Sequence, residues 1–142
     1  MNIAETALSW LNTPYHSMAK IKGVGVDCAQ LLIGVYEEAG ILKPGEIIHG
    51  AYTHDFHLHR SEEKYLSWIE KYCDRVNQSE PGDIVTFKFG RCVSHAGIVL
   101  DWPRIIHAYV GYGVIISNYD DAILCDNGGT SRLHGIYRVR GE

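Results

Sequence analysis

The sequence lacks the features of several special classes of protein. Its net charge of −4 provides no basic face for nucleic acid. No stretch approaches the roughly 20 apolar residues of a membrane span. The first residues, Met-Asn-Ile-Ala-Glu, have no basic segment followed by an apolar run, so no signal peptide is expected. No Cys-x-x-Cys pair is present, which argues against a structural zinc site and favours four free thiols in a reducing compartment. The cysteines are Cys28, Cys73, Cys92 and Cys125.

What the chain does contain is an ordinary globular composition. It has 142 residues, of which 46% are hydrophobic and 21% charged, so disorder, collagen and coiled coil are excluded for the chain as a whole. This length is typical of one domain, and we expect a single domain over residues 1–142. Glycine, tyrosine and histidine are frequent, with 15, 9 and 8 residues. The histidine excess raises the question of whether some of them perform chemistry.

The order of predicted elements indicates an α+β fold. Helical spacing of apolar residues predicts helices over 2–11, 28–39 and 61–72. Asp27 is a candidate N-cap of the second helix and Gly40 its stop, whereas residues 15–26 are predicted to form a loop. Helices first and strands afterwards are typical of helices packed on one side of an antiparallel sheet of about five strands. The strands are predicted over 83–89, 95–100, 104–110, 113–118 and 133–139.

Cys28 is the thiol with the strongest indication of chemistry. It would lie in the first turn of its helix, where the helix dipole favours the thiolate and lowers the pKa. Its spacing from Leu31 and Leu32 places it on the inward face of the helix. The alternative is a buried structural thiol, because free cysteine is among the most buried residue types.

A nucleophilic cysteine needs a base, and His95 and His107 lie on neighbouring predicted strands. Side chains alternate between the two faces of a strand. A hairpin loop of two or four residues would therefore place the two histidines on opposite faces. A three-residue loop at Trp102-Pro103-Arg104 would pair Val99 with His107 and put both histidines on one face. The catalytic interpretation requires such an odd loop or a bulge.

Five segments together resemble the NlpC-type cell-wall peptidases, a papain-like family of bacterial and phage cysteine hydrolases. They occur in the family's order, at similar spacing, and cover nearly the whole chain. The compact form, with Gly-Val-Gly-Val-Asp-Cys before the helix, is similar to the branch associated with phage tails. The segments are Trp-Leu-Asn-Thr-Pro-Tyr (10–15), Gly-Val-Gly-Val-Asp-Cys (23–28), Pro-Gly-Asp-Ile-Val (81–85), Ser-His-Ala-Gly-Ile-Val-Leu (94–100) and Ile-Ile-His-Ala (105–108).

The resemblance implies a role for each matching residue. Cys28 would be the nucleophile and His95 the general base, with His107 in the third position, where it holds the His95 ring in one tautomer. Tyr15 would assist at the oxyanion or the substrate, beside the Cys28 backbone N–H. Asp27 would pair with the free amine of the substrate, although a helix N-cap explains it equally well. The chain departs from the family's usual Asp-Cys-Ser-Gly, because Ala29 and Gln30 follow Cys28, which puts cleft shape and substrate contacts in question.

The cluster His54, His57 and His59, with His49 nearby, invites a metal interpretation. No zinc template has this spacing, and we favour a solvated loop in which His57 and His59 form part of the rim of the cleft. No metal and no cofactor are therefore expected.

The resemblance implies a cysteine peptidase that hydrolyses an amide in peptidoglycan stem peptides, between D-Glu and the diamino acid. Two alternatives remain open: a non-enzymatic phage tail assembly component that keeps the fold, and an amidase or acyltransferase that uses the same Cys-His-His site. The expected partners are a peptidoglycan peptide and phage tail proteins, with no nucleic acid and no membrane. The expected location is the virion tail, or the bacterial cytoplasm before assembly.

Overall fold

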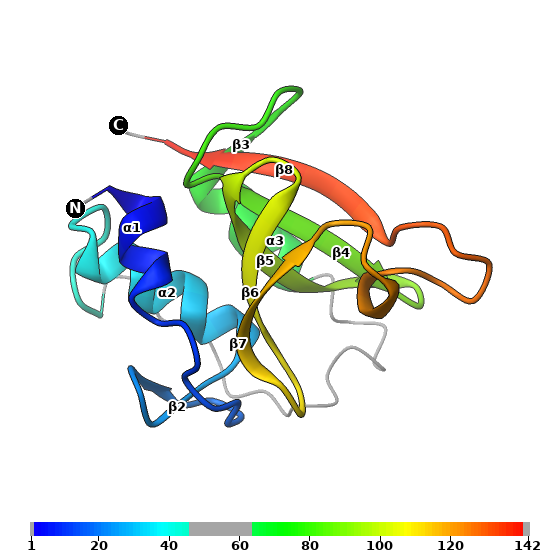
Figure 1. Ribbon diagram of the computed structural model, residues 1–142. Coiled ribbons are helices and arrows are strands. Elements are labelled where there is room, and N and C mark those ends of the chain that lie inside the picture. Colours follow the sequence, from blue (N-terminus) through cyan, green and yellow to red (C-terminus); the bar gives the residue numbers. More distant parts are fainter. Residues whose placement is uncertain (1, 46–63, 141–142) are drawn as a thin grey trace.

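The computed structural model describes residues 2–45 and 64–140 (Figure 1). Most of the helical structure precedes the main sheet along the chain, as the sequence predicts, and the α+β class is confirmed. The described residues form α1 (Ile3–Leu8), α2 (Cys28–Glu38), α3 (Lys64–Tyr72) and a short 3-10 helix, η3 (Ala122–Leu124).

The main sheet has six strands, and every neighbouring pair in it is antiparallel. In spatial order these strands are β3 (Cys73–Val76), β8 (Leu133–Val139), β4 (Ile84–Phe89), β5 (Cys92–Asp101), β6 (Arg104–Tyr109) and β7 (Gly113–Asn118). A separate two-stranded sheet consists of β1 (Lys20–Ile21) and β2 (Gly25–Val26).

The prediction of about five strands is too low, because it lacks β3 and the small β1–β2 pair. Strand β3 follows α3 directly and exposes Asp74 and Arg75 in succession. An edge strand with exposed charges has no alternation of apolar residues, so its sequence pattern does not reveal it. The first predicted helix ends earlier than expected, at Leu8, and residues 61–63 of the third lie outside the described residues.

Local sequence explains where α1 begins and where α2 ends. In α1, the Asn2 side chain accepts a hydrogen bond from the Glu5 N–H at 2.7 Å, and the Glu5 carboxylate accepts one from the Asn2 N–H. This reciprocal capping satisfies N–H groups that have no partner inside the helix. Just after the C-terminus of α2, Gly40 has a φ of +82°, a conformation that glycine adopts without a steric penalty. Its predicted role as a helix stop is confirmed.

The sheet separates two hydrophobic clusters. One lies between the sheet and the three helices, with α1 and α2 on the left of the sheet in Figure 1. The other lies on the opposite face, beneath the connection between β7 and β8. The buried members of this second cluster are Val85, Phe87, Val99, Ile105 and Leu124.

A bulge in β5 decides which face His95 and His107 share. Asp101 lies opposite Arg104, and Val99 opposite Ile105, so Leu100 is an extra residue in β5. The connection between them, Trp102-Pro103, has two residues, so the alternative with a three-residue loop and a Val99–His107 pair is not the one observed. The extra residue restores the parity that the short loop would have lost. Both histidines therefore lie on one face, as the alternative with a bulge requires.

Gly97 gives β6 the space to pack closely against β5 at His107. A Cβ atom at Gly97 would lie 2.8 Å from the Ile106 carbonyl oxygen and 3.0 Å from the His107 Cβ. Both distances are shorter than ordinary van der Waals contact, and the first involves backbone that cannot rotate away. The backbone spacing behind His107 thus depends on the absence of a side chain at Gly97.

The segment Pro81-Gly82-Asp83, just before β4, connects the start of that strand to β8. The Asp83 side chain is buried and accepts two hydrogen bonds from the Arg138 guanidinium, both at 2.9 Å. It also accepts the Glu80 N–H at 2.7 Å, which closes the turn before the strand. The Gly82 N–H donates to the Val99 carbonyl at 2.8 Å. This motif therefore aligns β4 with its two neighbours in the sheet.

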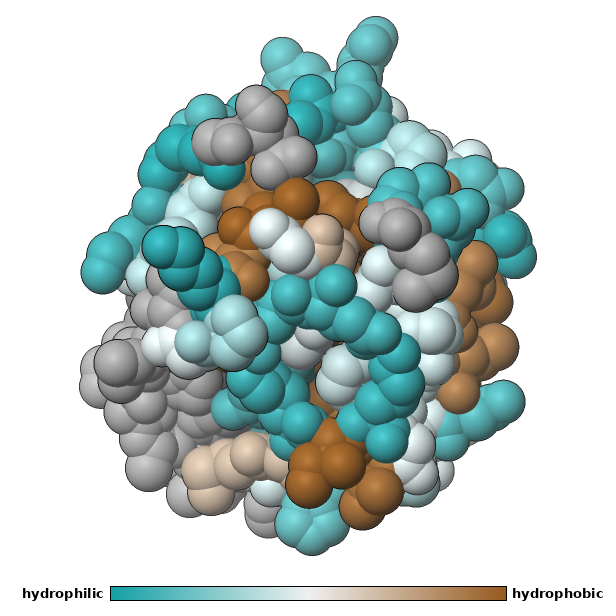
Figure 2. Space-filling model, turned by 90° about the vertical axis from the view of Figure 1, so that its left-hand side faces the viewer, coloured by the Kyte–Doolittle hydropathy of each residue, from teal (hydrophilic) through white to brown (hydrophobic). Residues whose placement is uncertain are grey.

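One face of the molecule is mainly hydrophilic. Its hydrophobic side chains lie in separate areas among hydrophilic ones (Figure 2). Among the described residues, the exposed large hydrophobic side chains include Ile21 and Val24 near the β1–β2 turn and Tyr112 near the β6–β7 turn. None of the described helices is long and apolar enough to cross a membrane.

We predict that Gly97→Ala lowers the free energy of unfolding by about 1–3 kcal/mol, because the added methyl overpacks the β5–β6 contact. Urea unfolding measures this change. Gly128→Ala is the matched control, since a Cβ there would meet only the Asp126 side chain at 3.4 Å. The control should change the free energy by less than about 0.5 kcal/mol. Equal effects of the two substitutions would contradict this account of Gly97.

Candidate functional site

Cys28 is the first residue of α2 and lies beside strand β5. Its side chain is half-buried, and its Sγ lies 3.8 Å from the carbonyl oxygen of Ser94. On the Ser94 side, the last pair between β5 and β6 is Ile98–Ile106. The N-terminus of α2 therefore contacts β5 at Ser94, outside the paired part of these two strands. The predicted inward orientation of the thiol, toward the sheet, is thus observed. Ser94 directly precedes His95, so the thiol contacts β5 one residue before the predicted base.

Asp27 connects the start of α2 to the preceding loop. One carboxylate oxygen accepts the Gln30 N–H at 2.9 Å, and the other accepts the Met18 N–H at 2.6 Å. The first bond makes Asp27 the N-cap of α2, while the second holds Met18 at a φ of +65°. Only 2% of Asp27 is exposed. The cap is therefore present, and the pairing of Asp27 with a substrate amine stays a prediction.

Tyr15 lies close to both Cys28 and Asp27. Its backbone forms a bridge with Val26, and its side chain packs against the core cluster under the helices. Burial raises the pKa of the Tyr15 phenol well above its ordinary value, and the nearby charges of Cys28 and Asp27 raise it further. The phenol is therefore protonated at neutral pH and can donate a hydrogen bond.

His95 and His107 form the centre of a buried chain of hydrogen-bonding groups. The His95 Nε2 lies 2.8 Å from the His107 Nδ1, and the His107 Nε2 lies 2.8 Å from the Ser117 Oγ. The three residues are 7%, 0% and 6% exposed. Polar groups buried this deeply are stable only when they have hydrogen-bond partners, which they supply to one another.

Aromatic rings surround His95 on its other sides. Phe89 and Tyr109 meet the imidazole edge-on, with centroid distances of 5.9 and 5.4 Å, and Phe87 lies at 5.8 Å. These rings cover much of the imidazole and limit the orientations it can adopt. The ring is thus fixed by packing as well as by its hydrogen bond to His107.

The sequence does not predict Ser117. It lies opposite Ile105 across the β6–β7 ladder, and therefore diagonally from His107 on the same face of the sheet. A serine in an otherwise apolar strand is a weak signal, because many such residues only hydrogen-bond to the backbone. Its contact with His107 depends on the register of two strands, which the sequence does not specify.

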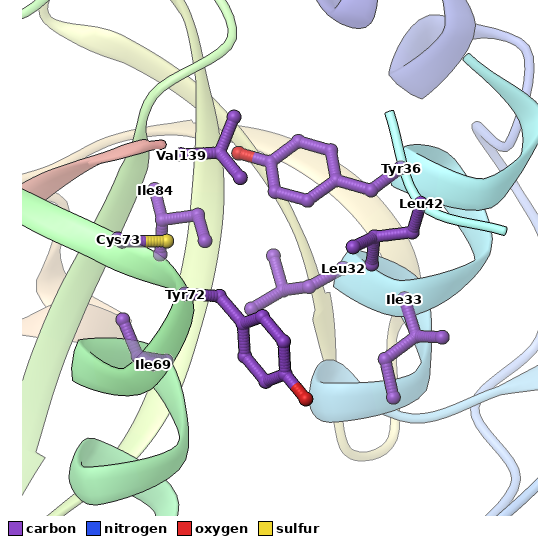
Figure 3. Close-up of a pocket in the computed structure, with 9 residues that line it drawn as sticks. All are labelled: Leu32, Ile33, Tyr36, Leu42, Ile69, Tyr72, Cys73, Ile84 and Val139. Carbon is purple, nitrogen blue, oxygen red and sulfur yellow. The ribbon is translucent and has the colours of Figure 1, made fainter. Parts of the chain in front are cut away.

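A separate pocket lies away from these residues, between α2 and α3 (Figure 3). Its lining is almost wholly apolar, and none of the predicted site residues contributes to it. Burial raises the pKa of the Cys73 thiol in this pocket to about 12, so that thiol stays protonated. The lining residues are Leu32, Ile33, Tyr36, Leu42, Ile69, Tyr72, Cys73, Ile84 and Val139.

The predicted cleft-rim residues His57 and His59, together with His49 and His54, lie outside the described residues. Among residues 2–45 and 64–140, no group of three or more His, Cys, Asp and Glu side chains could hold a metal ion. The other five predicted site residues lie in two groups, Tyr15 with Asp27 and Cys28, and His95 with His107. The contact of the Cys28 thiol with the Ser94 carbonyl connects the two groups.

Comparison with known families identifies the group to which the chain belongs. The model of the NlpC/P60 family matches residues 12–127, a range that includes all five of these residues and Ser117. The chain belongs to the NlpC/P60 family. Among proteins with curated descriptions, none matches it.

Solved NlpC/P60 structures have the same fold. A lipoprotein-like NLP/P60 protein of Staphylococcus aureus superposes with a TM-score of 0.62 at 21% identity, over 99% of this chain and 41% of that chain. The NlpC/p60 domain of the peptidoglycan hydrolase SagA superposes with a TM-score of 0.53 at 21% identity, over 82% of this chain and 86% of that domain. The peptidoglycan hydrolase RipB of Mycobacterium tuberculosis superposes with a TM-score of 0.57 at 17% identity, over 99% of this chain and 64% of that chain. The expected papain-like α+β fold is confirmed.

We predict that His107 makes the stability of this NlpC/P60 chain depend on pH. Burial lowers the His107 pKa from 6.5 to about 4, and the Asp121 charge opposes this shift only in part. Above pH 6.5 the imidazole is neutral in both the folded and the unfolded chain. Between pH 6.5 and 4 only the unfolded chain binds the proton, so the free energy of unfolding should fall by up to about 3 kcal/mol across this range.

Urea unfolding at pH 7, 5.5 and 4.5 tests this dependence against His107→Asn, which cannot titrate. The variant should lose less stability than the wild type as the pH falls. Identical pH dependence of the two proteins would show that His107 does not carry the effect.

Proposed function

We propose that the chain is a cysteine peptidase that hydrolyses amide bonds in peptidoglycan stem peptides. The observation that carries this proposal is the buried His95–His107–Ser117 chain, which begins beside the residue whose carbonyl contacts the Cys28 thiol. Membership of the NlpC/P60 family supports it. The names of SagA and RipB, which are peptidoglycan hydrolases with the same fold, support the choice of substrate.

In the proposed reaction, the His95 Nδ1 accepts the Cys28 proton, because Nε2 is already directed at His107. The thiolate attacks the scissile carbonyl, and the negative charge that develops on its oxygen is stabilised by the Cys28 backbone N–H and the Tyr15 phenol. The His95 imidazolium then protonates the leaving amine as the C–N bond breaks, which leaves a thioester on Cys28. Water, deprotonated by His95, hydrolyses that thioester and regenerates the thiol.

His107 and Ser117 hold His95 ready for this proton transfer. With its proton on Nε2, a neutral His107 donates to the Ser117 Oγ and accepts the His95 Nε2–H at Nδ1. The lowered His107 pKa keeps it neutral above about pH 4, so it remains an acceptor when His95 becomes charged. A second positive charge beside the imidazolium is thereby avoided.

We further propose the amide between D-Glu and the diamino acid as the bond that is cleaved. We also propose association with a phage or prophage tail, with the protein in the bacterial cytoplasm before assembly and bound there to tail proteins rather than to nucleic acid or membrane. The support for the bond is the resemblance of the chain to the family as a whole, and the support for the tail association is the resemblance of the compact form with Gly-Val-Gly-Val-Asp-Cys at residues 23–28 to the tail-associated branch. The chain spans 41% of the length of the S. aureus protein, so it corresponds to one part of such longer chains.

Cys28→Ala should fold normally, because the side chain is only half-buried and alanine keeps its Cβ against the core. It should hydrolyse no peptidoglycan peptide, because the proposed nucleophile is absent. Digestion of purified muropeptides, followed by mass spectrometry, measures the activity and identifies the bond. Cys125→Ala is the control, since the Cys125 thiol donates to the nearby Asp120 carbonyl at 3.2 Å and not to a predicted site residue, and it should retain full activity.

Hydrolysis by Cys28→Ala at the wild-type rate would exclude Cys28 as the nucleophile. If the wild type releases no product, labelling by iodoacetamide at pH 6 separates the alternatives. An ordinary thiol with a pKa of about 8.5 reacts slowly there. Cys28 labelling no faster than Cys73, Cys92 or Cys125 indicates a tail component without enzymatic activity. Fast labelling indicates an amidase or acyltransferase with another substrate.

Ser117→Ala should lower kcat about tenfold and leave KM unchanged, because it leaves the buried His107 N–H without an acceptor and does not touch the substrate. A tenfold change corresponds to roughly 1.4 kcal/mol, within the usual cost of an unsatisfied buried donor. Ser117→Thr keeps the hydroxyl and should restore most of the rate. Equal kcat values for the alanine and threonine variants would show that the hydroxyl has no positioning role.

A further inference from the structure

Arg132 is a half-buried cation close to the surroundings of His95. Its guanidinium lies over the face of Phe89, 4.7 Å from the ring centroid, and Phe89 in turn meets His95 edge-on. The Arg132 Nε–H donates to the Cys125 carbonyl at 3.3 Å. One nitrogen of the guanidinium is therefore used by the protein itself, and the two terminal nitrogens form no hydrogen bond with the residues that the structure describes.

The position of Arg132 is fixed by its backbone. Its N–H donates to the Leu124 carbonyl at 2.8 Å, and its carbonyl accepts the Lys88 N–H at 2.9 Å. These bonds tie the end of the β7–β8 connection to η3 and to β4, which lie next to each other in Figure 1. Burial raises the pKa of Tyr109, the other ring that meets His95 edge-on, and the Arg132 charge partly opposes this rise. The cation therefore lies near Tyr109 as well as Phe89.

Arg132 has no carboxylate partner among the residues that the structure describes. The ion pairs found there involve five other basic residues, namely Lys20, Lys22, Arg104, Arg138 and Arg140. Lys88 and Arg91, at the neighbouring β4–β5 turn, also form no described ion pair. A partly desolvated cation without a counter-charge costs free energy, which an anionic ligand would offset. The chain as a whole is acidic, so this local positive charge is not a general property of its surface.

The proposed reaction determines which part of a substrate would reach Arg132. His95 protonates the leaving amine, so the leaving residue lies against His95 and its ring neighbours, on the side away from the acyl group held at Cys28. We infer that Arg132 binds a free carboxylate on the leaving residue, and that the preferred substrates are amides whose leaving group is an amino acid with an unblocked carboxyl group. The planar guanidinium suits such a carboxylate, because it can donate two parallel hydrogen bonds. This inference rests on the proposed function.

Binding to the full-length Cys28→Ala protein tests the inference without any need for turnover. The probes are the tripeptide L-Ala-γ-D-Glu-L-Lys and its C-terminal amide, which differ only in the carboxyl group of the leaving residue. Isothermal titration should show about tenfold tighter binding of the free acid. Arg132→Gln on the same background should reduce this preference to near unity, whereas Arg132→Lys, which keeps the charge but not the planar fork, should retain about threefold.

Arg104→Gln is the matched control, because it removes an arginine whose partner is the exposed Asp101 at the opposite end of the β5–β6 hairpin. It should leave the tenfold preference intact. Equal binding of the two tripeptides, no binding of either, or a preference that survives Arg132→Gln would each overturn the inference. Failure of the wild type to hydrolyse the tripeptides, with the preference for the free acid still present, would instead overturn the proposed chemistry.

Discussion

The hydrogen bond between His95 and His107 depends on one extra residue in a strand. Leu100 lengthens β5 relative to β6 by one position, and without it the two imidazoles would project from opposite faces of the sheet. Gly97 completes the arrangement, because a side chain there would push against the backbone that carries His107. The local register thus determines the geometry of the whole buried chain that ends at Ser117.

A neutral third residue suits a site that is so deeply buried. A carboxylate at the position of His107 would lose its hydration on burial and would need further donors or a permanent counter-charge. An imidazole with a lowered pKa avoids this cost, since it accepts one hydrogen bond and donates another without carrying charge. Ser117 ends the chain with a group that can both accept and donate. The polar chain can therefore lie among Phe87, Phe89 and Tyr109 without an ion in the core.

Much of the fold and of the candidate site could be predicted from the sequence. The start of α2 at Cys28 follows from an N-cap and a helical apolar stripe, which are local properties. Residue type, strand position and the family resemblance together indicate His95 and His107. The condition that they share a face could be stated, but not whether a loop or a bulge meets it, because both fit the same residues. The bulge became visible only in the pairing of Val99 with Ile105.

The features that the sequence does not reveal, two residues and one strand, have one property in common. Ser117 and Arg132 matter through neighbours distant in the chain, and β3 is recognisable as a strand only through its pairing with β8. None of these has a periodic pattern or a motif of its own. Such features depend on tertiary contacts, which override or supplement what local propensity can indicate.

The double role of the Asp27 carboxylate has a consequence for motion in the site. One oxygen holds the first turn of the helix that carries Cys28, and the other holds Met18 in the loop that carries Tyr15. The helix that carries the thiol and the loop that carries the phenol are therefore joined through one carboxylate, and a displacement of the loop at Met18 must break or stretch that bond or move the helix start with it. A site coupled in this way needs little reorganisation when charge develops on a bound carbonyl, since its dipoles are already oriented before the substrate arrives.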